Sequence, residues 1–162
     1  MSIFKRIHKQ ITACICAVTM TVAILGHPMT ARAVSPRGAI AQGVDVSKYN
    51  GNIDWKQVAS AGMKFALIKA GSTNSGIDPN FDANIRGAQA VGIKTGVYIY
   101  SYATTPEEAI EEANLVLQWI APYTVNFPVV FDIEDRCHKN LSTEQLIAII
   151  NSFCMTIDAA GY

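Results

Sequence analysis

The chain has 162 residues, half of them apolar, with 13 basic and 13 acidic side chains. This is enough for one globular domain, and the composition excludes a fibrous or disordered protein. Four of the basic residues and none of the acidic ones lie in residues 1–33, so the remainder carries a net charge of about −4. No basic patch is present, and we therefore expect no nucleic-acid partner.

The first 33 residues have the features of a secretory signal peptide. A basic start precedes an apolar stretch over residues 11–26, and the small residues Ala31 and Ala33 form a cleavage site. We expect cleavage after Ala33, a secreted protein of the extracellular space or cell wall, and no stable membrane association afterwards. The alternative is an uncleaved anchor, although the stretch is shorter than the ~20 residues that span a bilayer. A short linker, 34–42, would then lead to a domain over 43–162.

From residue 43 onward, short apolar runs alternate with longer segments that begin at a helix cap, which is typical of repeated βα units. The runs are apolar almost throughout, as in strands that are buried on both faces of a parallel sheet. We expect four strands, over residues 43–47, 64–70, 94–100 and 127–132.

Each expected helix has a start and a stop signal in the sequence. The starts are Asp54, Asp78 with Pro79 in the first turn, and the two capping boxes Thr105–Glu108 and Ser142–Gln145. The stops are Gly62, Gly92, Pro122 and Gly161. The pattern therefore predicts four βα units.

A complete (β/α)₈ barrel usually takes about 200 residues or more. Four units can form an open or dimerised sheet, or they can be a truncated piece of a longer domain. Because the chain stops at a helix C-terminus in the middle of this rhythm, we expect truncation, with a further strand directly after Tyr162.

Two cysteines follow the expected signal peptide. Cys154 falls near the middle of the last helix, roughly 17 Å along the axis from its start, whereas Cys137 lies in the loop before that helix. This separation is too large for a disulfide. We expect two free thiols, with Cys154 buried and Cys137 in a loop.

Carboxylates follow or interrupt two of the expected strands, near the strand ends where parallel α/β proteins bind ligands. Asp45 interrupts the first strand, and either accepts hydrogen bonds from the next loop or has a functional role. Asp132 and Glu134 close the fourth strand two residues apart, and so on one face. Two close carboxylates in an apolar setting raise one pKa, which supplies the acid and the anion of glycosidic cleavage. The same pair also occurs in divalent metal sites and at exposed strand ends.

Tyrosines occupy every second position of the third strand, at Tyr98, Tyr100 and Tyr102. Sugars bind flat on such rings. We interpret Tyr98, deeper in the strand, as barrel filler, and Tyr100 and Tyr102, nearer the mouth, as substrate contacts. His138 is the only histidine after the expected signal peptide, which excludes a His-rich zinc site.

Ordered segments of this sequence resemble the family 25 glycoside hydrolases, the Chalaropsis-type lysozymes. The resemblance runs from about residue 43 to residue 162 and is carried by GVDVS at 43–47 with NIDW at 52–55, FALIKA at 65–70, DPNF at 78–81, GVYIY at 96–100 and FDIE at 131–134. It implies an α/β fold, a modified β/α barrel of which about the first four βα units are present.

The resemblance also implies an activity, a muramidase that cuts the β-1,4 bond from N-acetylmuramic acid to N-acetylglucosamine in bacterial cell-wall peptidoglycan. Glu134 matches the general acid, Asp132 the carboxylate that supports the 2-acetamido group in substrate-assisted cleavage, and Asp45 a cleft aspartate. No metal or organic cofactor is implied. Family members continue through further strands that add another acidic residue and an aromatic cleft wall.

Two other functions stay open at this stage. The chain can be an inactive fragment or a glycan-binding remnant of such an enzyme. It can also be a metal-dependent phosphodiesterase on a similar barrel, with Asp132 and Glu134 as ligands to a hard cation.

Overall fold

The computed structural model describes residues 38–162, and the expected signal peptide lies outside this range. The strands are β1 (Gly43–Val46), β2 (Phe65–Ser72), β3 (Gly76–Ile77), β4 (Lys94–Tyr100) and β5 (Val129–Asp132), and the α-helices are α2 (Trp55–Ser60), α3 (Phe81–Ala90), α4 (Pro106–Ile120) and α5 (Thr143–Ala159). Two 3₁₀ turns, η1 (Lys48–Asn50) and η2 (Arg136–Asn140), follow β1 and β5. Within this range no helix is long and apolar enough to cross a membrane.

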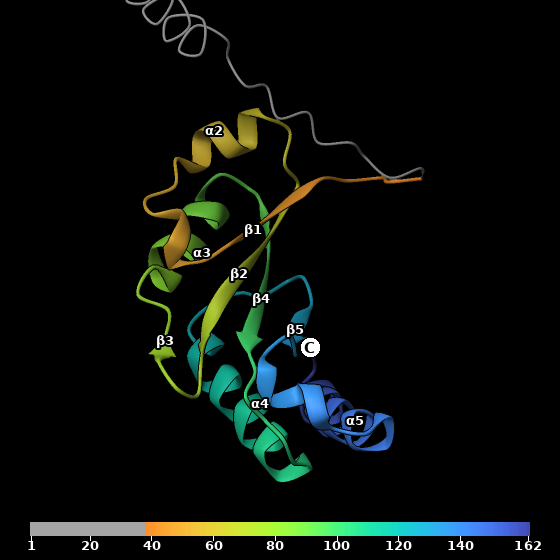
Figure 1. Ribbon diagram of the computed structural model, residues 1–162. Helices are drawn as coiled ribbons and strands as arrows, with labels where there is room; N and C mark the ends of the chain where they lie inside the picture. The colour runs from red at the N-terminus through yellow and green to blue at the C-terminus, as the bar shows by residue number, and fades with distance from the viewer. Residues whose placement is uncertain (1–37) are drawn as a thin grey trace, which may run out of the picture. The chain divides into compact units, whose positions relative to one another are not determined.

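The sheet confirms the predicted α/β class. Strands β1, β2, β4 and β5 are neighbours in that order and run parallel, and each leads into a helix, so the four predicted βα units are present (Figure 1). The short strand β3 was not expected and pairs antiparallel with the end of β2. Closure of these strands into a barrel stays a prediction.

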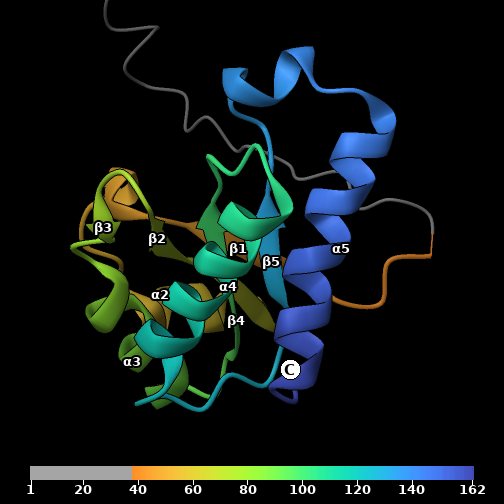
Figure 2. The ribbon, with the colours of Figure 1, turned by 90° about the horizontal axis from the view of Figure 1, so that it is seen from below.

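The two faces of the sheet differ in burial, so the expectation of strands buried on both faces is wrong for the described residues. On one face, Ala66, Ile68, Val97 and Ile99 are fully buried. On the other face, the side chains are half-buried or exposed. They are Phe65, Leu67 and Lys69 of β2, and Lys94, Tyr98 and Tyr100 of β4. Figure 2 shows α4 in front of the strands and α5 beside β5. The helices therefore cover one face and leave the other accessible.

Capping explains where most of the helices begin. The Asp54 carboxylate accepts the backbone N–H groups at the start of α2, and Thr105 and Ser142 form the predicted capping boxes of α4 and α5. Gly62 and Gly92 have φ angles of 88° and 76° just past their helices, a region that glycine enters without strain.

Asp78 does not have the predicted capping role. Helix α3 begins at Phe81, after Asn80. The Asp78 carboxylate accepts the Asn80 N–H at 2.9 Å and the Lys48 N–H at 3.1 Å. The side chain is 5% exposed, so it joins the turn after β1 to the turn before α3.

Both cysteines of the described range are free, as predicted, but the expected burial of Cys154 is wrong. Helix α5 buries Ile149, Phe153 and Ile157, which recur every four residues. Cys154 follows Phe153 directly and so lies on the exposed side of the helix. Cys137 is half-buried in η2.

Candidate active site

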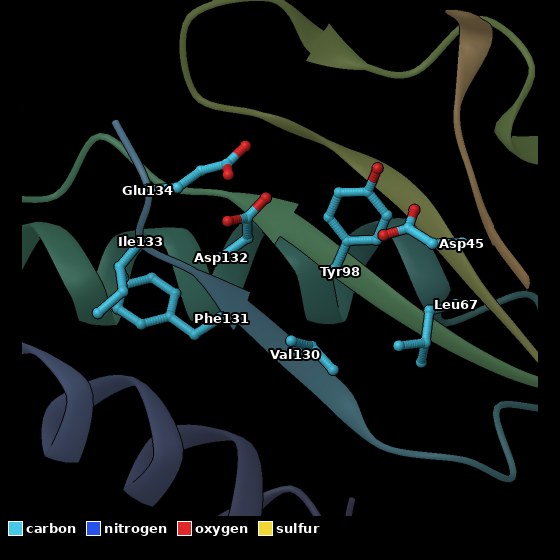
Figure 3. Close-up of a pocket in the computed structure, with 8 residues that line it drawn as sticks. All are labelled: Asp45, Leu67, Tyr98, Val130, Phe131, Asp132, Ile133 and Glu134. Carbon is cyan, nitrogen blue, oxygen red and sulfur yellow. The ribbon is translucent and has the colours of Figure 1, made fainter. Parts of the chain in front are cut away.

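The three predicted carboxylates lie in one pocket at the C-terminal ends of the strands. The pocket has a volume of about 360 Å³ and its lining residues come from β1, β2, β4, β5 and the segment after β5 (Figure 3): Asp45, Leu67, Tyr98, Val130, Phe131, Asp132, Ile133 and Glu134. Asp45 and Glu134 are exposed and Asp132 is half-buried. The structure thus brings together the acidic residues that the strand ends suggested.

Strand register explains this convergence. Asp45 pairs with Leu67 across β1 and β2, and Tyr100 pairs with Asp132 across β4 and β5. Side chains two residues apart on a strand share a face. Asp132 therefore shares the accessible face with the pocket residues of the neighbouring strands. Glu134 follows β5, and its carboxylate lies beside that of Asp132 in Figure 3.

Burial and neighbouring charge perturb Asp132. Burial, and then the charges of Glu134 and Asp45, raise the pKa of Asp132, while the Lys69 ammonium acts against them. The sequence predicted a raised pKa in the Asp132 and Glu134 pair, and the rise falls on Asp132. The assignment of the general acid to Glu134 rests on the family resemblance.

Tyr98 lies between the carboxylates, where its hydroxyl faces Asp45 (Figure 3). Burial raises the pKa of Tyr98, and the charges of Asp45 and Asp132 raise it further. The side chain stays a neutral hydroxyl that can donate a hydrogen bond. The sequence predicted Tyr98 to be barrel filler. In the described residues it lines the pocket instead, because no helix covers this face of the sheet.

Tyr100 and Tyr102 lie next to this pocket rather than in it. Their rings are 5.3 Å apart and line a second cavity of about 470 Å³. The Tyr100 hydroxyl donates to the Asp135 carboxylate at 3.1 Å. Burial and this carboxylate raise the pKa of Tyr100 to about 12. Substrate contact by either tyrosine remains a prediction.

Lys69 lines the second cavity and lies near Tyr98 of the first, and it was not identified from the sequence. Its ammonium lies 4.6 Å from the centre of the Tyr100 ring and 6.0 Å from that of Tyr98, within range of a cation–π interaction. A charged residue inside the apolar run of β2 was the signal that could have revealed it, as it did for Asp45. Over residues 38–162 no group of three or more His, Cys, Asp or Glu side chains is arranged to hold a metal ion.

The sequence can be assigned to a known family. The model of glycosyl hydrolases family 25 matches residues 44–162. The chain belongs to this family. Lysozyme M1 of Streptomyces globisporus is 40% identical to it over 120 residues, which cover 69% of this chain and 40% of that protein.

Solved structures of similar proteins share the fold. The lysozyme from Streptomyces coelicolor is 32% identical, with a TM-score of 0.61 over 75% of this chain and 59% of that one. The autolysin LytC from Streptococcus pneumoniae, solved in complex with a synthetic peptidoglycan ligand, is 27% identical, with a TM-score of 0.67 over 80% of this chain and 32% of that one. The family 25 chain therefore spans only part of the proteins it resembles, 40 to 41% of the length of the first relatives.

Proposed function

We propose that this family 25 chain carries the catalytic carboxylates of a muramidase, a glycosidase that cleaves the β-1,4 bond between N-acetylmuramic acid and N-acetylglucosamine in peptidoglycan. The observation that carries the proposal is the pocket in which Asp45, Asp132 and Glu134 meet at the strand ends. The lysozyme among its relatives and the peptidoglycan ligand of LytC support this substrate.

The proposed mechanism uses the two neighbouring carboxyl groups in different roles. Glu134, the more exposed of the two, donates a proton to the leaving oxygen of the glycosidic bond. The 2-acetamido oxygen of the substrate attacks the anomeric carbon as that bond breaks, and Asp132 supports the acetamido N–H. Water then opens the cyclic intermediate, with Glu134 accepting the proton. Asp45 and the Tyr98 hydroxyl hold the sugar from the β1 side.

A Glu134→Gln substitution tests the role of the proton donor. We expect the rate of release of reducing ends from purified peptidoglycan to fall at least ~100-fold, because glutamine cannot donate the proton, and general acid catalysis contributes about that much or more. Glu111→Gln is the matched control, since Glu111 is exposed on α4 away from the pocket. Equal rates for Glu134→Gln and the unsubstituted chain would contradict the assignment. Glycan binding with no cleavage by the unsubstituted chain would instead favour a glycan-binding remnant.

We also propose that the protein is exported and acts in the cell wall. The basic and apolar start of the sequence, and the lysozyme and the autolysin among the similar proteins, support this location. The mass of the exported protein gives the cleavage point, which we expect after Ala33.

A further inference from the structure

The second cavity, next to the carboxylate pocket, contains two lysines. Its volume is about 470 Å³, and the side chains that give it its chemical character are Lys48, Tyr49, Lys69, Ser72, Tyr100 and Tyr102. They come from the turn after β1 and from the C-terminal ends of β2 and β4. The cavity therefore opens along the same strand ends as the proposed catalytic pocket.

Neither lysine forms an ion pair within 4.0 Å in the described part of the chain, where the one such pair joins Arg86 and Asp82, although the Lys69 charge acts on the Asp132 carboxyl. The ammonium groups lie instead over aromatic rings, Lys48 at 5.2 Å from Tyr49 and Lys69 at 4.6 Å from Tyr100. Two positive charges beside one cavity attract an anion, most strongly where the walls exclude water.

The one carboxylate that lines the cavity does not neutralise both lysines. Asp78 is 5% exposed, and its two oxygens accept the backbone N–H groups of Lys48 and Asn80. Its hydrogen-bonding capacity is directed at the backbone, so both ammonium groups keep their donors for an incoming ligand.

A buried glutamate holds the wall of the cavity in place. One oxygen of Glu112, which is 1% exposed on α4, accepts the Tyr102 N–H at 2.9 Å and the Thr73 hydroxyl at 3.0 Å. These two bonds tie the segments after β2 and β4 to the same helix. The tyrosine wall is thus fixed before a ligand arrives, which lowers the entropic cost of binding.

From these observations we propose that the second cavity binds a carboxylate carried by the muramic acid residue, either on its lactyl group or on its stem peptide. The proposal rests on the proposed function. In this proposal the scissile bond lies at Asp132 and Glu134, and the acidic substituent of the same glycan lies beside Lys69 and Lys48, with the tyrosine rings against its apolar parts. A glycan of N-acetylglucosamine alone has no such group, so the cavity selects peptidoglycan over a neutral polymer.

The binding experiment compares three glycans of equal length. They are a muramic acid oligosaccharide with free lactyl carboxylates, the same oligosaccharide with stem peptides, and an N-acetylglucosamine oligomer. Titration calorimetry uses the full chain carrying Glu134→Gln, so that the ligand is not cut. We expect at least one acidic glycan to bind roughly tenfold or more tightly than the neutral one at low salt, a difference that shrinks as salt is added.

Lysine variants in the same background locate the effect. We expect Lys69→Met and Lys48→Met each to lower the affinity for the preferred acidic glycan several-fold while the neutral glycan binds as before. Lys94→Met is the control, since Lys94 is exposed at the opposite end of β4. Thermal melts show that each variant is folded.

The outcomes separate the two proposals. A preference for the free lactyl glycan, or for the peptide-bearing one, names which carboxylate the cavity takes. Equal affinity for acidic and neutral glycans, or equal loss in Lys69→Met and Lys94→Met, would overturn the subsite and leave the proposed function standing. No binding of any glycan would overturn both.

Discussion

Replacement of Phe153 by alanine tests whether the 162-residue chain folds with the packing described. The Phe153 ring stacks on Phe131 of β5 at a centroid distance of 4.2 Å and an interplanar angle of 13°. It is 1% exposed and belongs to the core that joins α5 to the sheet. Phe131 precedes Asp132 directly, so this contact also supports the strand end that carries the candidate catalytic pair.

The expected loss of stability follows from this burial. A fully buried phenylalanine removes about 150–250 Å² from water, worth ~4–6 kcal/mol at ~25 cal/mol per Å². Alanine retains part of that burial, and phenylalanine-to-alanine changes in cores cost about 3–5 kcal/mol. Domains of this size are stable by about 5–15 kcal/mol, so Phe153→Ala removes a large share of the free energy of unfolding.

Urea denaturation followed by circular dichroism measures this loss. Met155→Ala is the matched control, because Met155 lies two residues further along α5 and is 72% exposed. We expect its effect to stay within about 0.5 kcal/mol. A chain without a cooperative transition, or equal effects of the two substitutions, would refute the packing of α5 on β5.

Two further substitutions test the site and its support. The pKa of Asp132 in the folded protein lies above its ordinary value of 3.8, so the folded protein binds this proton more tightly than the unfolded chain does. The free energy of unfolding therefore falls as the pH rises from the unfolded pKa to the folded pKa of Asp132. We expect Asp132→Asn to flatten this dependence and to be more stable than the parent at neutral pH; an unchanged pH profile of the urea midpoint would contradict the raised pKa. Glu112→Ala leaves the Tyr102 N–H without its acceptor and should cost about 2–3 kcal/mol, whereas Glu112→Gln keeps the bonded oxygen and should cost less. Equal midpoints for the two variants would show that these hydrogen bonds add no stability.

The sequence predicted the parallel sheet because its signals are local. Apolar runs bounded by caps and glycines located all four major strands, and β4 agrees at both ends with the predicted range of residues 94–100. The capping boxes at Thr105 and Ser142 were equally predictable from the sequence, since each depends on two residues three positions apart.

Features that depend on contacts between distant segments were not predictable in this way. Strand β3 forms where Gly71 lets the chain fold back closely: a Cβ atom at this position would lie 2.2 Å from the Gly76 carbonyl oxygen. The sequence DPNF suggested a helix cap at Asp78, but the turn after β1 supplies that carboxylate with a distant donor, the Lys48 N–H. Local propensity contains no information about such a partner.

The same distinction explains which parts of the site were found. Asp132 and Glu134 were predictable because they follow an apolar strand at the end where parallel α/β proteins bind ligands. Lys69 interrupts an apolar strand as Asp45 does, yet its significance depends on three strands: β2 carries it, β4 carries the tyrosines, and β5 carries Asp132. Acidic and basic side chains thus occur along the same strand ends, with Asp45 on β1, Lys69 on β2 and Asp132 on β5, and the tyrosines of β4 lie between the last two. In the function and the subsite proposed above, the acidic side chains face the positive charge that develops at the sugar ring and the lysines face the negative charge of its substituent. A neutral glycan would use only half of that arrangement.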